Sequence, residues 1–469
     1  MRKKKPKLIE NVQLTGIADK GRVVGRDAEG QVVFVEGGVP GDVADIWVTS
    51  KRKGFQEGYV QTIQVYSPDR VAPACAHFGV CGGCKWQHLD YGAQIREKER
   101  VVYDALERIG KIDLGEKYPI QGAADIFYYR NKLEFTFCNK KWLTAEEIGA
   151  GETNQVNVVG FHKAGAFDKI VPISDCLLQA APSNDIRNFV RDFADEHGYT
   201  FYDPKAQQGW LRNMVVRVTT LGQVMVILSI NSGNDKAIPV LLDALREKFP
   251  AITSLYFCIN PKKNDFLLDL EMQLYAGLPY IEEQLDHIRY RIGPKSFFQT
   301  NTRQAESLYR IVRDFAGLTG TENVYDLYTG LGSIALYLAG HSRQVVGVEE
   351  ISAAIADARE NALLNGIENV QFYAGDVKDI VSPEFMEQHG RPDVLVTDPP
   401  RAGMHPKVID ILLELESPVI VYVSCNPSTQ ARDLQLLAEK YDVAKVQPVD
   451  MFPHTHHIEN VALLRLKNR

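Results

Sequence analysis

The sequence predicts an α/β protein with three domains, and three observations lead to this prediction. The chain has 469 residues, about three times the roughly 150 residues of a typical domain. Short alternating strand patterns occupy residues 8 to 65, and five strand-like runs alternate with helical segments after residue 291. We therefore expect a small barrel at residues 1–66, a central α+β domain at residues 67–290, and a doubly wound sheet at residues 291–469.

The composition is that of an ordinary soluble globular protein, with 45% hydrophobic and 24% charged residues. No apolar run approaches the roughly 20 residues of a membrane span, and the opening MRKKKPK lacks the apolar stretch of a secretory signal. We therefore expect a cytoplasmic protein with no membrane association. Its seven cysteines are better explained there by metal binding or catalysis than by disulfides.

The first region contains short alternating runs, VQLTGIAD, GQVVFVEG and DVADIWVTS, separated by turns that contain glycine. This spacing predicts a five-stranded barrel of the oligonucleotide-binding kind, although an SH3-like barrel would fit the same pattern. The net charge is -7, yet the first sixty residues hold eleven Lys or Arg against eight Asp or Glu. The basic clusters MRKKKPK and SKRKGFQEGY fit RNA contacts and a solvated surface equally well.

The middle region mixes helices with strands such as YRNKLEFTFC and carries three closely spaced cysteines. Cys75, Cys81 and Cys84 follow the spacing C-x5-C-x2-C, and Cys176 is the natural fourth thiol. Four cysteines would serve zinc equally well. The tight glycine-rich triad with a distant fourth ligand favours an iron-sulfur cluster.

The third region alternates strands with helices. The strand-like runs are NVYDLYTGLGSIALYLA, QVVGVEE, VQFYAGD, DVLVTDPP and VIVYVSCNP, and segments such as ISAAIADARENALLNG lie between them. This alternation implies right-handed crossovers and a parallel sheet with helices on both faces. We expect a Rossmann-like catalytic domain.

The cofactor follows from the polar residues at the ends of these strands. Gly330 and Gly332 lie at the first strand-to-helix turn, and Glu349 ends the second strand, where it can accept hydrogen bonds from the ribose hydroxyls of an adenosine. Glycine spacing alone leaves a nicotinamide-dependent dehydrogenase open. The acidic rim at Asp376 and Asp398 would repel phosphates but suits the sulfonium and amino groups of S-adenosyl-L-methionine. A methyltransferase is therefore favoured.

Cys425 differs from the other cysteines outside the proposed metal site in its expected position. Cys138 and Cys258 lie in apolar strand-like runs and should belong to the core, whereas Cys425 follows the fifth strand, at the edge where parallel sheets bind ligands. Beside a cofactor site, it is a candidate nucleophile. This role requires a deprotonated thiol, and an amide-rich strand-to-helix turn can lower a thiol pKa.

Six motifs occur in order along the chain: C-x5-C-x2-C, FFQTN, DLYTGLGS, DPPRAG, SCNP and HTHHIEN. With them the sequence resembles the RNA uracil-C5 methyltransferases over nearly its whole length. Within this family it resembles the branch that acts on 23S ribosomal RNA and carries a TRAM domain and a [4Fe-4S] cluster. Two departures are Thr329, where many members have Cys, and Ser333, where many have Asn.

The resemblance implies a role for each residue that matches a family motif. The cluster ligands would be Cys75, Cys81, Cys84 and Cys176. Cys425 would be the nucleophile and Glu459 the proton acceptor. The positions that match the S-adenosyl-L-methionine site of a class I methyltransferase domain are Gln299, Tyr328, Ser333, Glu349, Asp376 and Asp398.

The implied activity is methyl transfer to C5 of a flipped uridine in 23S ribosomal RNA, by a monomer. Three alternatives stay open. A tRNA uracil-5-methyltransferase shares the catalytic motifs. An amino-group methyltransferase has a motif like Asp398-Pro399-Pro400, but with an aromatic residue where this chain has Arg401. The third alternative is a non-catalytic iron-sulfur RNA-binding module.

Two further groups allow a functional and a structural interpretation. Phe297 and Phe298, beside Gln299, are either surfaces for base stacking or core residues. The short histidine tract His454, His456 and His457 precedes the last strand, where a structural role is more common than metal binding.

Overall fold

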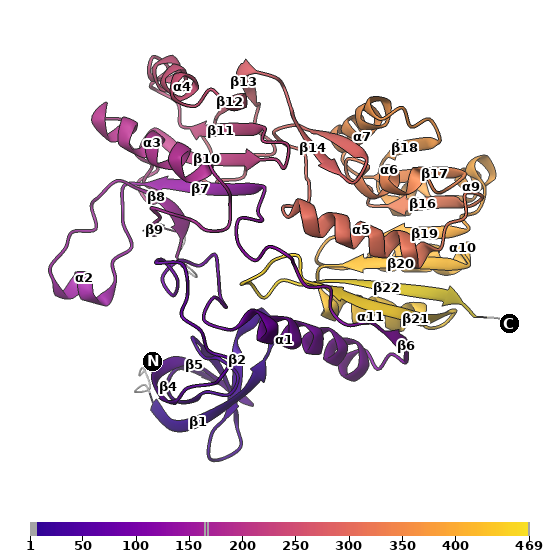
Figure 1. Ribbon diagram of the computed structural model, residues 1–469, viewed down its shortest axis with the longest axis horizontal. Helices are drawn as coiled ribbons and strands as arrows, with labels where there is room; N and C mark the ends of the chain where they lie inside the picture. The colour runs from indigo at the N-terminus through magenta and orange to yellow at the C-terminus, as the bar shows by residue number, and fades with distance from the viewer. Residues whose placement is uncertain (1–6, 164–165, 167, 468–469) are drawn as a thin grey trace.

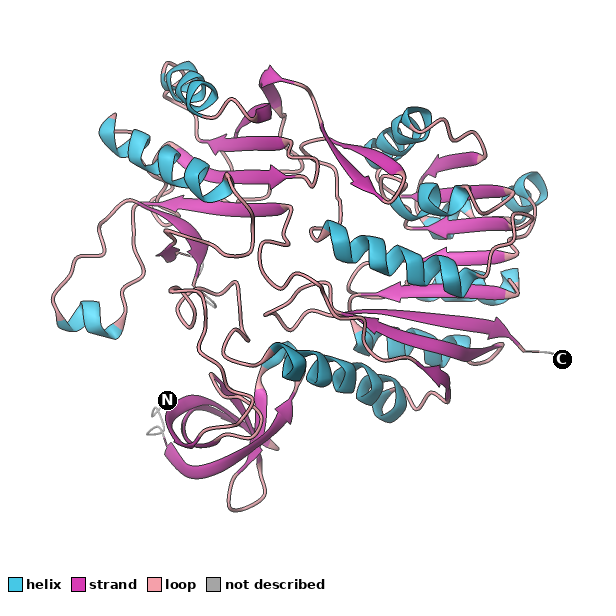
Figure 2. Ribbon diagram, in the orientation of Figure 1, coloured by secondary structure: helices cyan, strands magenta, loops and turns pink. Residues whose placement is uncertain are grey.

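The computed structural model describes residues 7–163, 166 and 168–467, in which three larger β-sheets and one two-stranded hairpin are formed (Figure 1). A closed barrel comes first, a seven-stranded sheet follows, and an eight-stranded sheet carries the carboxyl-terminal part (Figure 2). Among the described helices, none is long and apolar enough to cross a lipid bilayer.

The barrel confirms the five strands expected at the amino-terminal end. Its strands close in the order β1-β2-β3-β5-β4. Alternate residues of β4, Ala44, Ile46 and Val48, point into the barrel core, as the alternating pattern predicted. The basic run at residues 1–6 lies outside the described residues. The strands are β1 (Lys7–Ile17), β2 (Val23–Arg26), β3 (Val32–Glu36), β4 (Val43–Arg52) and β5 (Phe55–Val65), with a 3-10 turn η1 (Asp19–Gly21).

Helix α1 (Tyr91–Asp104) joins the barrel to the catalytic sheet (Figure 1). Asp90 caps its first turn by accepting a hydrogen bond from the amide of Ala93. Ala93 packs in the barrel core, whereas Val102 packs in the core of the catalytic sheet. The helix continues as a π-turn, η2 (Ala105–Ile109), and leads to β6 (Leu114–Lys117).

The central domain is a seven-stranded sheet with two helices, α3 and α4, packed against it. The short helix α2 stands out on the long connection between β7 and β8 (Figure 1). Cys138 and Cys258 are both fully buried, so the prediction that they belong to the core is confirmed. The elements are β7 (Lys132–Cys138), α2 (Ala145–Gly149), β8 (Val158–His162), β9 (Ile170–Pro172), α3 (Ser183–Glu196), β10 (Leu211–Val218), β11 (Val224–Ile230), α4 (Ala237–Lys248), β12 (Ile252–Ile259) and β13 (Gln273–Gly277).

The catalytic sheet has the order β18-β17-β16-β19-β20-β22-β21-β6. Strands β16 to β20 are parallel, and β22 runs antiparallel to β20. The five strand-like runs of the sequence are these five parallel strands. The elements are α5 (Thr302–Ala316), β16 (Asn323–Leu327), α6 (Ser333–Ala339), β17 (Gln344–Glu349), α7 (Ser352–Leu364), β18 (Val370–Ala374), α8 (Val377–Ile380), α9 (Pro383–His389), β19 (Val394–Thr397), α10 (Pro406–Leu415), β20 (Val419–Ser424), α11 (Pro427–Leu437), β21 (Tyr441–Val449) and β22 (Glu459–Leu466).

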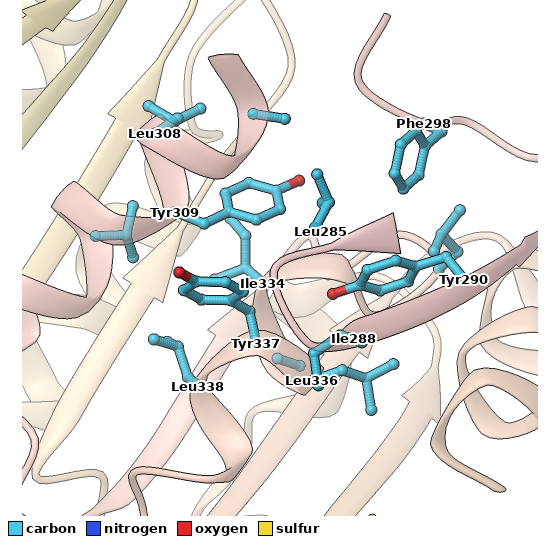
Figure 3. Packing of buried hydrophobic residues seen from close by; sticks show 14 of the residues in the cluster. Leu285, Ile288, Tyr290, Phe298, Leu308, Tyr309, Ile334, Leu336, Tyr337 and Leu338 are labelled. Carbon is cyan, nitrogen blue, oxygen red and sulfur yellow. The ribbon is translucent and has the colours of Figure 1, made fainter. Parts of the chain in front are cut away.

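Two elements from the segment before residue 291 pack with the catalytic sheet. β6 forms its edge by pairing in parallel with β21. The hairpin of β14 (Ile281–Leu285) and β15 (Ile288–Ile292) packs against α5, α6 and α7. The expected boundary at residue 290 therefore falls inside β15. Figure 3 shows Tyr290 of this hairpin in the same apolar core as Tyr309 and Tyr337.

Candidate active site

The loop after β16 has the backbone geometry that close approach of a ligand requires. Tyr328, Gly330 and Gly332 all have positive φ, at 66°, 57° and 83°. A Cβ atom on Gly332 would lie 3.0 Å from the Phe372 ring and 3.1 Å from Ala358. Glycine is thus required at position 332 by both conformation and space, and the loop turns tightly into α6.

Glu349 fixes this loop from the neighbouring strand. One carboxylate oxygen accepts from the amide of Gly330 at 3.2 Å, and the other accepts from the amide of Ile351 at 3.0 Å. Asp376 caps α8 and forms an ion pair with Lys378, which lowers the pKa of the Asp376 carboxyl. The two acidic groups therefore lie at the carboxyl ends of adjacent strands, as predicted.

Two buried tyrosines, both labelled in Figure 3, form hydrogen bonds with Ser333. The Tyr309 hydroxyl donates to the Ser333 hydroxyl at 3.0 Å, and the Tyr290 hydroxyl donates to its carbonyl at 2.9 Å. Sequence reasoning missed both tyrosines, because they lie on other elements. Gln299 is half-buried, and its carbonyl accepts from the side-chain amide of Asn131 at 2.8 Å.

Two carboxyl groups at this edge have strongly raised pKa values. Burial raises the pKa of Asp326 and of Asp398 to about 7, and their mutual repulsion adds to the effect at Asp398. The Asp326 carboxyl accepts from the Thr329 hydroxyl at 2.5 Å. A cationic ligand would stabilise the ionised form of both groups. Asp326, the last residue but one of β16, is a candidate site residue that we did not predict.

Cys425 and Glu459 lie opposite each other at the ends of neighbouring strands. The β20–β22 ladder pairs Ser424 with Asn460, so the next residues along it are Cys425 and Glu459. Cys425 is half-buried, whereas Glu459 is only 5% exposed. Burial, with the repulsion of Asp398 second, raises the pKa of Glu459 well above its usual value.

In this structure the pKa of the Cys425 thiol is raised rather than lowered. Burial, followed by the acidic groups of Glu459 and Asp398, raises the pKa of its thiol to about 11. Arg401, which contacts the thiol, acts in the opposite direction. Loss of hydration on burial is thus the largest influence on the thiol pKa. Arg401 could have been found from the sequence, because it follows Asp398-Pro399-Pro400 at the end of β19. This strand lies next to β20, which Cys425 follows.

A cavity of about 430 Å³ opens from Cys425 toward the barrel. The catalytic sheet contributes Cys425, Arg401 and His457, the barrel contributes residues 17, 18, 20 and 21, and α1 contributes Lys98. The nucleophile candidate therefore lies at a cavity that the barrel helps to form.

The histidine tract makes structural contacts. His454 is buried, its Nδ1 lies 3.1 Å from Nε2 of Gln94, and its ring stacks on Phe127 with 4.5 Å between centroids. Burial lowers the pKa of His454 and His456 to about 4 and of His457 to about 3. All three imidazoles are therefore neutral near pH 7.

The four predicted cluster cysteines line one cavity of about 380 Å³. Burial raises the pKa of the Cys81 and Cys84 thiols to about 11 and 12, and the neighbouring thiols contribute. Within the described part of the chain, no group of three or more His, Cys, Asp or Glu side chains is arranged to hold a single metal ion. The thiols share a cavity without converging on one point.

The two phenylalanines beside Gln299 have different environments. Phe297 is 72% exposed, whereas Phe298 is 3% exposed and packs against Tyr290. Of these two rings, Phe297 is the one that is exposed to solvent and free of core packing.

Comparisons with known proteins agree with this geometry. Residues 272–467 match the family model described as tRNA (uracil-5-)-methyltransferase, and residues 9–60 match the TRAM domain. A protein of Bacteroides thetaiotaomicron, described as an uncharacterized RNA methyltransferase, is 52% identical over 93% of this chain and 97% of its own length. One of Porphyromonas gingivalis with the same description is 50% identical over 97% of this chain and 99% of its own.

A solved structure is similar over the full length. The Pyrococcus abyssi tRNA (uracil-54, C5)-methyltransferase, in complex with S-adenosyl-L-homocysteine, is 29% identical, has a TM-score of 0.73, and aligns over 96% of this chain and 99% of its own. These matches rule out the dehydrogenase, the amino-group methyltransferase and the non-catalytic module. The chain belongs to the family of S-adenosyl-L-methionine-dependent RNA (uracil-5-)-methyltransferases, with an amino-terminal TRAM domain.

Proposed function

We propose that the enzyme, acting as a monomer, methylates C5 of a uridine in 23S ribosomal RNA through a covalent adduct between Cys425 and C6. The observation that carries this proposal is the strand register, which sets Cys425 opposite Glu459. Cys425 also lines a cavity that it shares with the barrel. The target base must leave its stack to reach this cavity, and the exposed ring of Phe297 is a surface on which it can stack.

The chemistry uses the two opposed side chains in turn. The Cys425 thiolate adds to C6, and the electron pair moves to C5, which becomes a nucleophile. Bound S-adenosyl-L-methionine supplies the methyl group on a cationic sulfur. The Glu459 carboxylate then takes the proton from C5, the electrons of that bond restore the C5–C6 double bond, and the C6–sulfur bond breaks to release the thiolate.

The cofactor would lie along the rim that Gln299, Tyr328, Ser333, Glu349, Asp376 and Asp398 form. Glu349 ends β17, where it would accept hydrogen bonds from the ribose hydroxyls. Asp398 lies near Cys425 and Glu459, because its charge raises the pKa of both groups. A cationic sulfur at this position would offset the repulsion between the buried acids.

We further propose that Cys75, Cys81, Cys84 and Cys176 hold a [4Fe-4S] cluster. A single zinc ion needs all its thiolates about 2.3 Å from one point, whereas a four-iron cluster spreads its four cysteines over separate irons. The observation that supports the proposal is that all four cysteines line one cavity.

A tRNA substrate is the second candidate. The Pyrococcus abyssi structure that aligns over the full length is a tRNA methyltransferase. To separate the two, the enzyme is incubated with methyl-labelled S-adenosyl-L-methionine and either 23S ribosomal RNA or tRNA, and the labelled nucleoside is identified. We expect 5-methyluridine in the 23S RNA. Label confined to tRNA would establish the second candidate and overturn the first.

The covalent mechanism has a separate test. Cys425→Ala should abolish transfer while S-adenosyl-L-methionine binding persists, and Glu459→Gln should accumulate an RNA adduct that survives denaturing gel electrophoresis. Cys258→Ala, at a fully buried cysteine of the central sheet, is the matched control and should remain active. An active Cys425→Ala enzyme would refute the nucleophile.

A further inference from the structure

The loop at residues 450–458 connects β21 to β22 and ends at Glu459. The ladder pairs Val449 with Glu459, so the loop leaves and re-enters the sheet at one place. Its first residue, Asp450, is 0% exposed, and Glu459 is 5% exposed. The position of the proposed proton acceptor thus depends on how this loop is held.

A buried ion pair to helix α1 holds the start of the loop. Lys98 Nζ donates to Asp450 Oδ1 at 2.6 Å and to the Phe452 carbonyl at 3.0 Å. The Tyr91 hydroxyl donates to Asp450 Oδ2 at 2.9 Å. Lys98 is 1% exposed, and burial lowers the pKa of its amine while Asp450 raises it. Burying such a pair costs so much hydration that it is weak evidence for stability. Because the pair lies at the start of the loop, a role in fixing the loop explains it better than a contribution to stability.

The middle of the loop is held from the same side. Gln94, fully buried in α1, accepts from the His454 amide at 2.9 Å and contacts its Nδ1 at 3.1 Å. The amides of Lys85 and Trp86 donate to the His454 carbonyl at 2.8 and 3.1 Å. His454 itself has φ of 64°, a left-handed conformation that a non-glycine residue keeps only when its surroundings fix it.

We propose that Lys98 and Asp450, with Tyr91 and Gln94, are positioning residues that fix the 450–458 loop and so set Glu459 against the reaction centre. This inference rests on the proposed role of Glu459. In this role the residues act through that side chain, although Lys98 also lines the cavity at Cys425. Loosening the loop should therefore slow removal of the C5 proton more than attack by Cys425, which lies at the end of a different strand, β20.

Asp450→Asn tests the proposal, with Asp442→Asn as the matched control. Asp442 lies near the other end of β21, is 73% exposed and faces Lys467 at 3.6 Å. With 23S RNA or tRNA, whichever is methylated, Asp450→Asn should form the covalent adduct at nearly the wild-type rate in a single turnover. Its turnover should fall by about 100-fold, as expected when a catalytic group is misplaced by ~1 Å. The denaturation-resistant adduct should accumulate, and Asp442→Asn should behave as wild type.

Asp450→Asn leaves Lys98 buried without its charge partner and could lower the stability of the fold. A second variant therefore separates loss of stability from loss of positioning. Lys98→Met combined with Asp450→Asn removes both charges and should restore the unfolding temperature while the adduct still accumulates. A parallel fall of adduct formation and turnover in both variants would overturn the positioning role. Failure of Glu459→Gln to trap an adduct would instead refute the proposed function, so the two failures are distinguishable.

Discussion

The charged groups around the Cys425 thiol act on its ionisation in opposite directions. Burial and the acidic groups of Glu459 and Asp398 raise the pKa of its thiol to about 11, whereas Arg401 favours the thiolate. The thiol reacts only as the thiolate. The rate of adduct formation should therefore be limited by the small ionised fraction at neutral pH.

The pH dependence of adduct formation tests this account. A raised thiol pKa means that the thiolate fraction, and with it the single-turnover rate of adduct formation, should rise by about tenfold per pH unit from pH 6 to 9. Arg401→Met should move this rising limb to higher pH, because the opposing positive charge is lost, and Arg401→Lys should move it less. Rapid quenching followed by denaturing gels measures the rate. A rate that does not change with pH would contradict the account.

Phe297 and Phe298 are adjacent in sequence but should respond differently to the same substitution. Phe298→Ala should destabilise the fold by about 3–5 kcal/mol, because its ring is buried against Tyr290. Phe297→Ala should leave the unfolding temperature unchanged and weaken RNA binding by about 1–3 kcal/mol, the typical contribution of one stacked base. Thermal unfolding and RNA titration separate the two. Equal loss of stability in both variants would show that Phe297 is a packing residue.

At the scale of elements, the turn between β4 and β5 presents three consecutive basic residues. Lys51, Arg52 and Lys53 are all exposed at the tip of the barrel. If they contact phosphates, replacing all three with Gln should weaken RNA binding and reduce the magnitude of the salt slope by about 2, at roughly 0.7 per phosphate of single-stranded RNA. S-adenosyl-L-methionine binding should not change. An unaltered salt slope would establish the cluster as a solvated surface.

The sequence predicted the elements that local pattern determines. The alternating barrel strands, the five parallel strands and the polar residues at their ends were all predicted, because strand period and turn chemistry are local. The expected central domain, residues 67–290, includes the edge strand β6 and most of the hairpin of β14 and β15, which pack with the catalytic sheet. Their local patterns fit the central domain as well, and only packing against β21 and α7 decides. The raised pKa of Cys425 was likewise missed, since it depends on residues distant in sequence.

At the scale of the whole molecule, α1 and the segment before it connect the 450–458 loop to the barrel and to the proposed cluster site. Cys84 belongs to the proposed cluster site, and the next two residues, Lys85 and Trp86, donate their amides to His454. Trp86 also packs in the barrel core. The cluster segment, the barrel and the proposed proton acceptor are thus linked through a few covalent and hydrogen bonds.

Loss of the cluster should therefore loosen the 450–458 loop. With Cys84→Ser, or after anaerobic iron chelation, the Lys85 and Trp86 amides should no longer be fixed. Losing two hydrogen bonds of about 1 kcal/mol each should accelerate amide hydrogen exchange in the loop by about 30-fold. The edge strand β13 should keep its exchange rate and serves as the internal reference, and Cys258→Ser is the control substitution. Unchanged exchange in the loop of an iron-free protein, verified by loss of visible absorption, would show that the cluster does not support the proton acceptor.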